Sequence, residues 1–515
     1  MPLALAFHPM IGEHNICAVV AGRDARAMRR QLEGALVARS RVIELRLDWL
    51  GNEREMGRFL RALAPHLGPS RPARRATLIA TCRRVVAGGN FRGSIASQLA
   101  YLAEAVRAGC EWYDLEIESI RPCPRELLDA LLGEGRRLAS AHFFHGMPRD
   151  LRAVYRELRR TRSAAVKLAA RCDSLADGRR LLSLARRKPN VVAIPMGDVV
   201  LPLRVLALRE GSALSYAPVE TPTAPGQVSL EEMKNLYRAE RLNRRTGVYG
   251  IVGHPVAHSL SPAMQNAAFE TSRINSVYVR FPVRDLDDFV RAIVPMGIRG
   301  FSVTLPHKQA ILRHLDGCDR LAASIGAVNT VVVRGGGRLY GYNTDYVGVL
   351  RALGPRLPLR GARVLILGAG GAARAVAFAL TWAGAFVSIC ARRANRGRQL
   401  AQAVRGEAIE RAGIRRRFFD VIVNSTPVGM YPQVSDSPLE ARDLNCRLVF
   451  DTIYRPRATK LLEIAARRGI GTVSGLEMFV AQGAAQFEIW TGRRAPVQVM
   501  RRAALRGLAG PFRSS

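Results

Sequence analysis

The chain has 515 residues, 48% of them hydrophobic, and a formal net charge of +36. This length predicts two or three packed domains. No apolar run is long enough to cross a bilayer, and Met1–Cys17 lacks the basic start of a signal peptide, so we expect neither a membrane partner nor secretion.

From residue 15 to about 245, short apolar segments alternate with amphipathic helical patterns such as Ser97–Ala108 and Asp150–Arg160. Eight such units predict a (β/α)₈ TIM barrel. The expected strands are Ile16–Val20, Val42–Leu47, Thr77–Thr81, Trp112–Ile117, Arg137–His142, Ala165–Leu168, Val191–Pro195 and Leu214–Ala217.

Only five of the 78 basic residues are lysines: Lys167, Lys188, Lys234, Lys308 and Lys460. Unlike arginine, lysine can lose its proton and act as a nucleophile or proton donor. Lys167 lies in the apolar strand Ala-Ala-Val-Lys-Leu-Ala, where desolvation favours a nucleophilic amine. The alternatives are a lysine that reaches solvent or pairs with a carboxylate. Lys188, Lys234 and Lys460 are interpreted as solvated charges.

Other polar residues come at the carboxyl ends of the predicted barrel strands, where this fold carries its chemistry. His142 ends the strand before that of Lys167 and suits proton transfer, whereas a metal pair with His145 is not expected. In Glu44-Leu-Arg46-Leu-Asp48, alternation puts the charged residues on one strand face. The candidates for binding a carboxylate or hydroxyl groups are Arg83, Arg204, Thr223 and Gln227.

The polar segment Arg241–Gly247 predicts a linker to a second α/β region, which is interrupted near Gly354–Gly361. We therefore divide the chain into residues 1–245, 246–355, 356–495 and 496–515, the last a helix that folds back onto the second of these domains. Ser259 and Ser261 precede a predicted helix and suit a carboxylate, although simple helix capping by Ser261 is the alternative.

Three further motifs of this region carry Lys308, Asn329 and Asp345, each just after a strand or turn. A Lys–Asp pair suits proton transfer to an alkoxide during carbonyl reduction, and a structural salt bridge is the alternative.

A dinucleotide-binding motif follows the strand Arg363–Leu367: Gly368-Ala-Gly370-Gly371-Ala372-Ala373 opens a helix. Its N-terminus would hold a pyrophosphate. After the next strand, Phe386–Cys390, an NAD enzyme usually has an acidic residue, but here Arg392 and Arg393 follow Ala391. Positive charge at this point favours the 2′-phosphate of NADP.

The barrel motifs resemble those of type I 3-dehydroquinate dehydratases. They are Glu44-Leu-Arg46-Leu-Asp48, Thr81-Cys-Arg83, Asp114-Leu-Glu116, His142, Val166-Lys167, Met196-Gly197 with Arg204, and Ala224-Pro225-Gly226-Gln227. The resemblance implies a Schiff base at Lys167 and proton transfer by His142. It also implies substrate binding by Glu44, Arg46, Arg83, Arg204, Thr223 and Gln227. Two positions depart from the family pattern: Ala87 replaces a glutamate, and Phe143 replaces a polar residue.

The second half resembles shikimate dehydrogenases. The motifs are His258-Ser259-Leu-Ser261-Pro262, Val303-Thr304-Leu-Pro-His-Lys308, Gly326-Ala-Val-Asn329-Thr330, Asn343-Thr344-Asp345, Asn424-Ser-Thr426-Pro-Val-Gly429-Met430, Tyr454, and Ser474-Gly475-Leu-Glu-Met with Gln482. The resemblance implies Lys308 and Asp345 as the catalytic pair. It implies substrate binding by Ser259, Ser261, Thr304, Asn329, Tyr454 and Gln482, and NADP binding by Gly368, Gly370, Gly371, Ala372, Arg392, Arg393, Thr426 and Gly475. Tyr346 replaces a common glycine.

Together the resemblances imply two consecutive reactions: dehydration of 3-dehydroquinate to 3-dehydroshikimate, then reduction by NADPH to shikimate. One alternative is a shikimate dehydrogenase with an inactive or weakened barrel. The net charge suggests another, a polyanion-binding protein, but the arginines are dispersed and aromatic residues make up only 6%. We expect no specific nucleic-acid partner. Eight scattered cysteines without a Cys-x-x-Cys pair predict no metal site or disulfide and a cytoplasmic location.

Overall fold

The computed structural model describes residues 15–67, 76–133, 135–186, 188, 190–223 and 226–509. Most of the segment Met1–Cys17 and the motif residues Ala224 and Pro225 lie outside the described residues. The chain divides into two compact units: the first runs to Thr246 and includes Asp287–Ala292, and the second comprises the rest from Gly247. The segment Asp287–Ala292 belongs to helix α10 (Leu286–Met296). No helix in the described ranges is long and apolar enough to cross a membrane.

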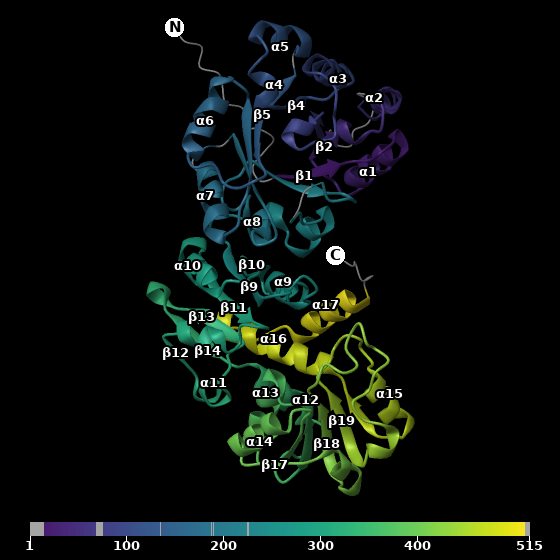
Figure 1. Ribbon diagram of the computed structural model, residues 1–515, viewed down its shortest axis with the longest axis vertical. Helices are drawn as coiled ribbons and strands as arrows, with labels where there is room; N and C mark the ends of the chain where they lie inside the picture. Colours follow the sequence, from purple (N-terminus) through teal and green to yellow (C-terminus); the bar gives the residue numbers. More distant parts are fainter. Residues whose placement is uncertain are drawn as a thin grey trace. The chain divides into compact units, whose positions relative to one another are not determined.

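The first unit is an eight-stranded parallel sheet in the order β7-β6-β5-β4-β3-β2-β1-β8 (Figure 1). A backbone hydrogen bond from Ala213 N to Val191 O (2.9 Å) links the two ends of this order, so the barrel is nearly closed. Its strands are β1 (Asn15–Val20), β2 (Val42–Arg46), β3 (Thr77–Thr81), β4 (Trp112–Glu116), β5 (Arg136–Phe143), β6 (Ala165–Arg171), β7 (Val191–Met196) and β8 (Leu214–Pro218).

Helices connect the barrel strands: α1 (Ala25–Val37), α2 (Glu53–Leu67), α3 (Ile95–Arg107), α4 (Ile117–Ile120), α5 (Arg125–Leu132), α6 (Leu151–Arg160), α7 (Leu175–Ala185) and α8 (Leu201–Leu206). Capping side chains at Asp24, Ser94, Asp150 and Ser174 start four of them. The predicted barrel is confirmed. Strand β6 runs three residues beyond the predicted Leu168, because Ala169 and Ala170 pair with both neighbouring strands.

The second unit contains two sheets. The first is mixed, in the order β10-β9-β11-β13-β14-β12. Its strands are β9 (Gly247–Gly253), β10 (Ser276–Pro282), β11 (Ile298–Val303), β12 (Gly317–Cys318), β13 (Thr330–Val333) and β14 (Leu339–Tyr342), and the helices α9 (Ser261–Thr271) and α11 (Arg320–Ile325) belong to the same part.

The second sheet is parallel, in the order β17-β16-β15-β18-β19-β20. This doubly wound order confirms the predicted Rossmann domain. Its strands are β15 (Arg363–Leu367), β16 (Phe386–Cys390), β17 (Glu407–Ala408), β18 (Phe419–Asn424), β19 (Cys446–Asp451) and β20 (Gly471–Val473). They alternate with α13 (Gly371–Trp382), α14 (Ala394–Ala403) and α15 (Lys460–Arg467).

Three more helices complete the second unit: α12 (Asp345–Leu353), α16 (Gly475–Thr491) and α17 (Val497–Ala509). Helices α12 and α16 pack side by side (Figure 1). Helix α16 contributes to two cores, because Met478 packs in the Rossmann core while Phe487 packs in the core around β9 and α9. Met500 of α17 joins the latter core. The helices thus tie together the two sheets of this unit.

Candidate active sites

The eight residues predicted for the barrel site line one cavity at the carboxyl ends of its strands. They come from β2, β5, β6 and α8 and from the loops after β3 and β8: Glu44, Arg46, Arg83, His142, Lys167, Arg204, Thr223 and Gln227. Residues without a prior assignment also line it, among them Tyr216 and Phe144. Parallel strands deliver their ends to one rim, which is why residues so distant in sequence converge.

Lys167 is buried, as predicted, but it also pairs with carboxylates. Its Nζ lies 2.5 Å from Asp114 Oδ2 and 3.4 Å from Glu44 Oε1. The ring of Tyr216 lies 4.4 Å from the same nitrogen, close enough for a cation–π contact. These groups are the partners of the amine, and only its neutral form can attack a carbonyl.

His142 is held by Arg83 rather than by a carboxylate. Arg83 Nη1 lies 3.2 Å from His142 Nδ1. Because a guanidinium only donates, Nδ1 accepts and the neutral ring carries its proton on Nε2. Burial, followed by the charges of Arg83 and Lys167, holds the pKa of His142 well below its usual value. Phe144 stacks on the imidazole at 6.0 Å between ring centroids. Ala87, where the resemblance leads us to expect a glutamate, is buried and supplies no acceptor.

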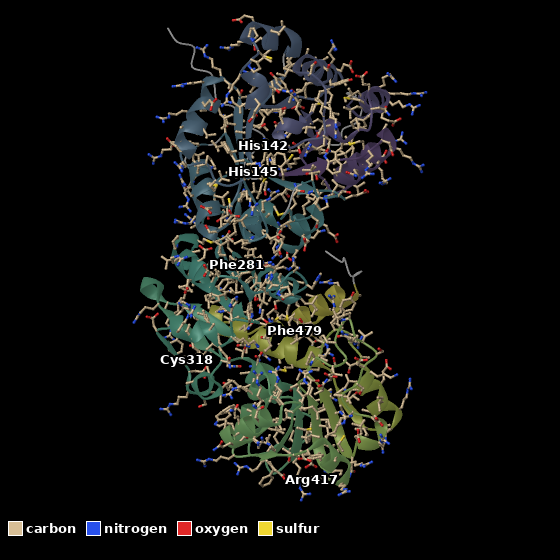
Figure 2. The ribbon with its side chains drawn as sticks, viewed as in Figure 1. His142, His145, Phe281, Cys318, Arg417 and Phe479 are labelled. Carbon is tan, nitrogen blue, oxygen red and sulfur yellow. The ribbon has the colours of Figure 1, made fainter. Side chains whose placement is uncertain are left out.

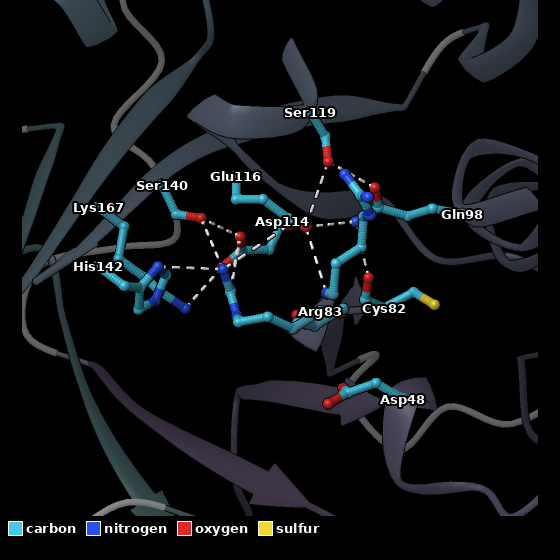
Figure 3. Close-up of polar contacts among 12 residues, drawn as sticks. Asp48, Cys82, Arg83, Gln98, Asp114, Glu116, Ser119, Ser140, His142 and Lys167 are labelled. Carbon is cyan, nitrogen blue, oxygen red and sulfur yellow. Dashed lines mark hydrogen bonds and ion pairs between the residues drawn. The ribbon is translucent and has the colours of Figure 1, made fainter. Parts of the chain in front are cut away.

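Asp114 pairs directly with Lys167 and is linked to His142 through Arg83 (Figure 3), a role that we did not predict. Its Oδ1 accepts from Ser140 Oγ at 2.6 Å and pairs with Arg83 Nη2 at 2.8 Å, while Oδ2 faces Lys167. Burial alone would raise the pKa of Asp114, but the charges of Arg83 and Lys167 hold it well below its usual value. The available signal was alternation along β4, which turns Asp114 and Glu116 to the same face as the site.

Replacing Asp114 by asparagine should destabilise the barrel by about 3–5 kcal/mol, because the variant leaves buried cations without their carboxylate. Hydrogen exchange of β4–β6 peptides in increasing urea measures this effect. The matched control is Asp129→Asn, which removes an exposed partner of Arg125 and should leave exchange unchanged. Equal exchange in both variants would show that the buried carboxylate is not needed for stability.

The remaining charges of the barrel site differ in their partners. Arg46 forms a bidentate pair with Asp48, with N···O distances of 2.9 and 2.8 Å. The prediction that Asp48 shares the strand face of Arg46 is wrong, because β2 ends at Arg46 and a short 3₁₀ turn carries Asp48. Arg204 instead donates to the carbonyls of Pro195 and Tyr216, and burial lowers its pKa to about 10. Within the described ranges no carboxylate acts on the pKa of Arg204, so its guanidinium can pair with an anionic ligand.

A second cavity, in the second unit, is lined by all eight predicted catalytic and substrate-binding residues of that half: Ser259, Ser261, Thr304, Lys308, Asn329, Asp345, Tyr454 and Gln482. Lys308 Nζ donates to Asp345 Oδ2 at 2.6 Å, and Asn329 Nδ2 donates to Oδ1 at 2.8 Å. The Lys308 side chain is 22% exposed, so its ammonium reaches both the carboxylate and the cavity. The pair can therefore deliver a proton to a bound oxygen.

The walls of this cavity come from α9 and α16. Leu260, not Ser261, is the N-cap of α9 and makes no side-chain cap bond, so simple capping by Ser261 is not what this helix start shows. Ser259 Oγ accepts from Ser261 N at 3.2 Å. Tyr454 also lines the cavity and stacks on Phe479 at 4.6 Å between ring centroids. Figure 2 labels Phe479 on α16. Gln482 Nε2 is anchored on Phe479 O at 2.9 Å. The rings of Tyr454 and Phe479 thus line the same cavity as the polar side chains of Lys308 and Asp345.

The predicted cofactor residues lie at the carboxyl edge of the Rossmann sheet. Gly368 has φ +109°, a conformation that favours glycine, and an added Cβ would meet Ser425 O at 3.0 Å and Thr426 Cγ2 at 3.2 Å. Open space surrounds Gly370 and Gly371 at the start of α13, where the helix has no side-chain cap. This N-terminus suits a pyrophosphate. Arg392 and Arg393 are exposed just after β16, and Ala372 and Gly475 line the catalytic cavity.

Comparison with known proteins finds one family in the first unit and two domains of another family in the second. The type I 3-dehydroquinase family matches residues 16–244, the shikimate dehydrogenase substrate binding domain matches 251–331, and the shikimate 5′-dehydrogenase C-terminal domain matches 475–505. A shikimate dehydrogenase (NADP(+)) from Methanopyrus kandleri is 44% identical over 52% of this chain and 98% of its own. A crystal structure of a shikimate dehydrogenase in complex with NADP+ aligns with a TM-score of 0.50 and 37% identity, over 52% of this chain and 98% of its own.

One relative matches across both units. The chloroplastic bifunctional 3-dehydroquinate dehydratase/shikimate dehydrogenase of Arabidopsis thaliana is 32% identical over 95% of this chain and 85% of its own length. This relative combines the barrel and the dehydrogenase in a single protein. The chain belongs to the family of bifunctional 3-dehydroquinate dehydratase/shikimate dehydrogenases.

Proposed function

We propose that this chain dehydrates 3-dehydroquinate to 3-dehydroshikimate in its barrel and reduces 3-dehydroshikimate to shikimate with NADPH in its second unit. The observation that carries the proposal is the presence of two separate lysine-centred cavities, one in each unit. The activity named for the relative that spans both units supports it. An assay of each step alone, with purified protein, tests it.

In the barrel, Lys167 would attack the substrate ketone and form an imine, releasing one water. The protonated imine withdraws electrons from the adjacent carbon, whose proton His142 accepts. The neighbouring hydroxyl then leaves as water with a proton, and a further water hydrolyses the imine and restores Lys167. Arg204 is the candidate for the substrate carboxylate, since its guanidinium is buried and donates only to carbonyls in the described structure.

A second candidate function is reduction alone, with a weakened barrel, and one contact favours it. Arg83 donates to His142 Nδ1, which puts the ring's proton on Nε2. A base facing the cavity through Nε2 needs the opposite tautomer, which requires an acceptor at Nδ1. The position of Ala87 supplies none. Imine trapping at Lys167 separates the two candidates.

In the second unit, NADPH supplies a hydride when it is bound. Lys308 would donate a proton to the developing alkoxide of the substrate, and Asp345 holds the ammonium in place. Ser259 and Ser261 would bind the carboxylate beside the start of α9. The backbone N–H groups that begin α13 would bind the pyrophosphate, and Arg392 would bind the 2′-phosphate. A cytoplasmic location is also proposed, supported by eight free cysteines.

Replacing Arg392 by alanine should weaken NADPH binding about tenfold and leave NADH binding nearly unchanged, because only NADPH carries the 2′-phosphate. Kd values for both cofactors, measured by fluorescence titration, test this role. Arg396→Ala, which removes an exposed arginine from α14, is the matched control. Equal weakening of both cofactors would remove the 2′-phosphate from the assignment of Arg392.

A further inference from the structure

A line of buried hydrogen bonds begins at Tyr278 on β10. Its phenol donates to Ser302 Oγ of β11 at 2.6 Å. Ser302 donates in turn to Gln486 Oε1 of α16 at 2.8 Å. All three side chains are buried, Tyr278 completely. Because Ser302 uses its single proton on Gln486, its oxygen accepts from the phenol, and the direction of both bonds is fixed.

The line continues from Gln486 to the proposed catalytic pair. Gln486 Nε2 donates to Thr330 Oγ1 at 3.1 Å, and Thr330 donates to Asn329 Oδ1 at 2.8 Å. Asn329 Nδ2 then donates to Asp345 Oδ1 at 2.8 Å. Every donor in the line points toward Asp345, so each bond polarises the next. This arrangement fixes the rotation of the carboxylate and leaves Oδ2 for Lys308 at 2.6 Å.

The opposite end of the line meets the wall of the cavity. The side chain of Ser261, one of the proposed carboxylate ligands, also lies beside the phenol of Tyr278. Ser261, Ser302 and Gln486 line the cavity, whereas Tyr278 stands behind them. One buried hydroxyl group therefore connects the two ends of the proposed substrate site.

We infer that Tyr278 is a positioning residue for the reduction. It acts on the orientation of Asp345 through Ser302 and Gln486, and on the cavity wall through Ser261. The inference rests on the proposed function, in which Lys308 and Asp345 transfer the proton. Tyr278 does not touch the substrate, so its effect should appear in kcat for reduction and not in cofactor binding.

The first test is Tyr278→Phe in the full chain, which removes only the hydroxyl group. We expect kcat for 3-dehydroshikimate reduction to fall about three- to tenfold, the effect of one lost buried hydrogen bond. KM for NADPH and the dehydration rate should not change. Tyr249→Phe is the matched control, since Tyr249 is a buried tyrosine on the adjacent strand that packs on Phe269 and Trp490. Unchanged kcat in Tyr278→Phe would overturn the inference.

The second test asks whether Tyr278 acts through the line. In a Ser302→Ala background, where the line is already broken, adding Tyr278→Phe should lower kcat by less than about 1.5-fold. If Tyr278→Phe lowers kcat in this background as much as it does in the wild type, its effect does not pass through Ser302 and the inference is overturned. A loss that extends to KM for NADPH would indicate general destabilisation and would also overturn the inference. Failure of the proposed function is distinguishable, because the wild-type chain itself would then not reduce 3-dehydroshikimate.

Discussion

Replacing Lys167 by methionine is expected to lower the rate of 3-dehydroquinate dehydration by more than about a thousandfold, with no change in 3-dehydroshikimate reduction. Methionine preserves the length of the side chain but provides no amine for an imine. Among the described residues that line this cavity, Lys167 is the one with an amine that can form an imine, so the loss should be nearly complete. Absorbance of the conjugated product measures dehydration, and NADPH oxidation on supplied 3-dehydroshikimate measures reduction in the same preparation.

Lys167→Arg is the control for charge. Arginine keeps a cation beside Asp114, so the buried ion pair persists, but it cannot form the imine. Both variants should therefore be inactive in dehydration, although only the methionine variant removes the positive charge beside Asp114. Borohydride with 3-dehydroquinate should trap an adduct on Lys167 of the wild type. Absence of that adduct would favour the second candidate, reduction with a weakened barrel.

Replacing Lys308 by alanine is the prediction with the next largest effect. We expect kcat for reduction to fall about 10²- to 10⁴-fold, because no other side chain of the proposed site donates a proton to the alkoxide. Asp345 would lose the partner that lies 2.6 Å from its Oδ2. The Kd of NADPH should stay the same, because the proposed cofactor residues follow strands of the Rossmann sheet, whereas Lys308 follows β11 of the other sheet. Stopped-flow reduction and fluorescence titration measure the two quantities.

Lys460→Ala is the matched control for this variant. Lys460 begins α15, has a side chain that is 39% exposed, and pairs at 3.8 Å with Glu463. Its removal should change neither kcat nor cofactor binding. If Lys308→Ala instead weakens NADPH binding and preserves kcat at saturation, Lys308 is a cofactor ligand and the proton donor must be sought elsewhere.

The sequence was sufficient to predict the fold. Strands buried on both faces appear as continuous apolar runs, so Thr77–Thr81 and Arg363–Leu367 have the predicted limits. Phe386–Cys390, whose burial alternates, also has them. Errors occur where local pattern and pairing disagree. Alternation predicted one face for Arg46 and Asp48, but the backbone turns between them. The predicted end of β6 at Leu168 was too early. Ala169 and Ala170 gave no strand signal, but their pairing with β7 extends the strand.

The site residues could be predicted wherever a strand end carried a reactive side chain in a distinctive motif. What the sequence could not give was the partner of each group. Asp114 is close to Arg83 and Lys167 only because three strands meet, and the spacing between them in sequence carries no trace of that contact. Ser302 and Gln486 are 184 positions apart, yet they share a hydrogen bond. Such pairings depend on tertiary packing.

The contacts also separate the five lysines. Lys188 Nζ lies 3.6 Å from the ring centroid of Tyr155, and Lys234 Nζ donates to Ala38 O at 2.8 Å. The interpretation of Lys234 as a solvated charge is wrong, because only 13% of its side chain is exposed and its ammonium is held by backbone carbonyls. Lys167 and Lys308 alone line the two cavities, each beside an aspartate. A scarce residue thus marks both sites, but the carboxylate beside each lysine determines what the amine can do.

The most direct test of the central claim is a coupled assay with the single purified chain, 3-dehydroquinate and NADPH. We predict that shikimate accumulates and that one NADPH is oxidised for each 3-dehydroquinate consumed. We also predict that a mixture of the Lys167→Met and Lys308→Ala variants restores the flux that each lacks. NADPH oxidation that begins only when 3-dehydroshikimate is supplied would contradict the claim that one chain carries both activities.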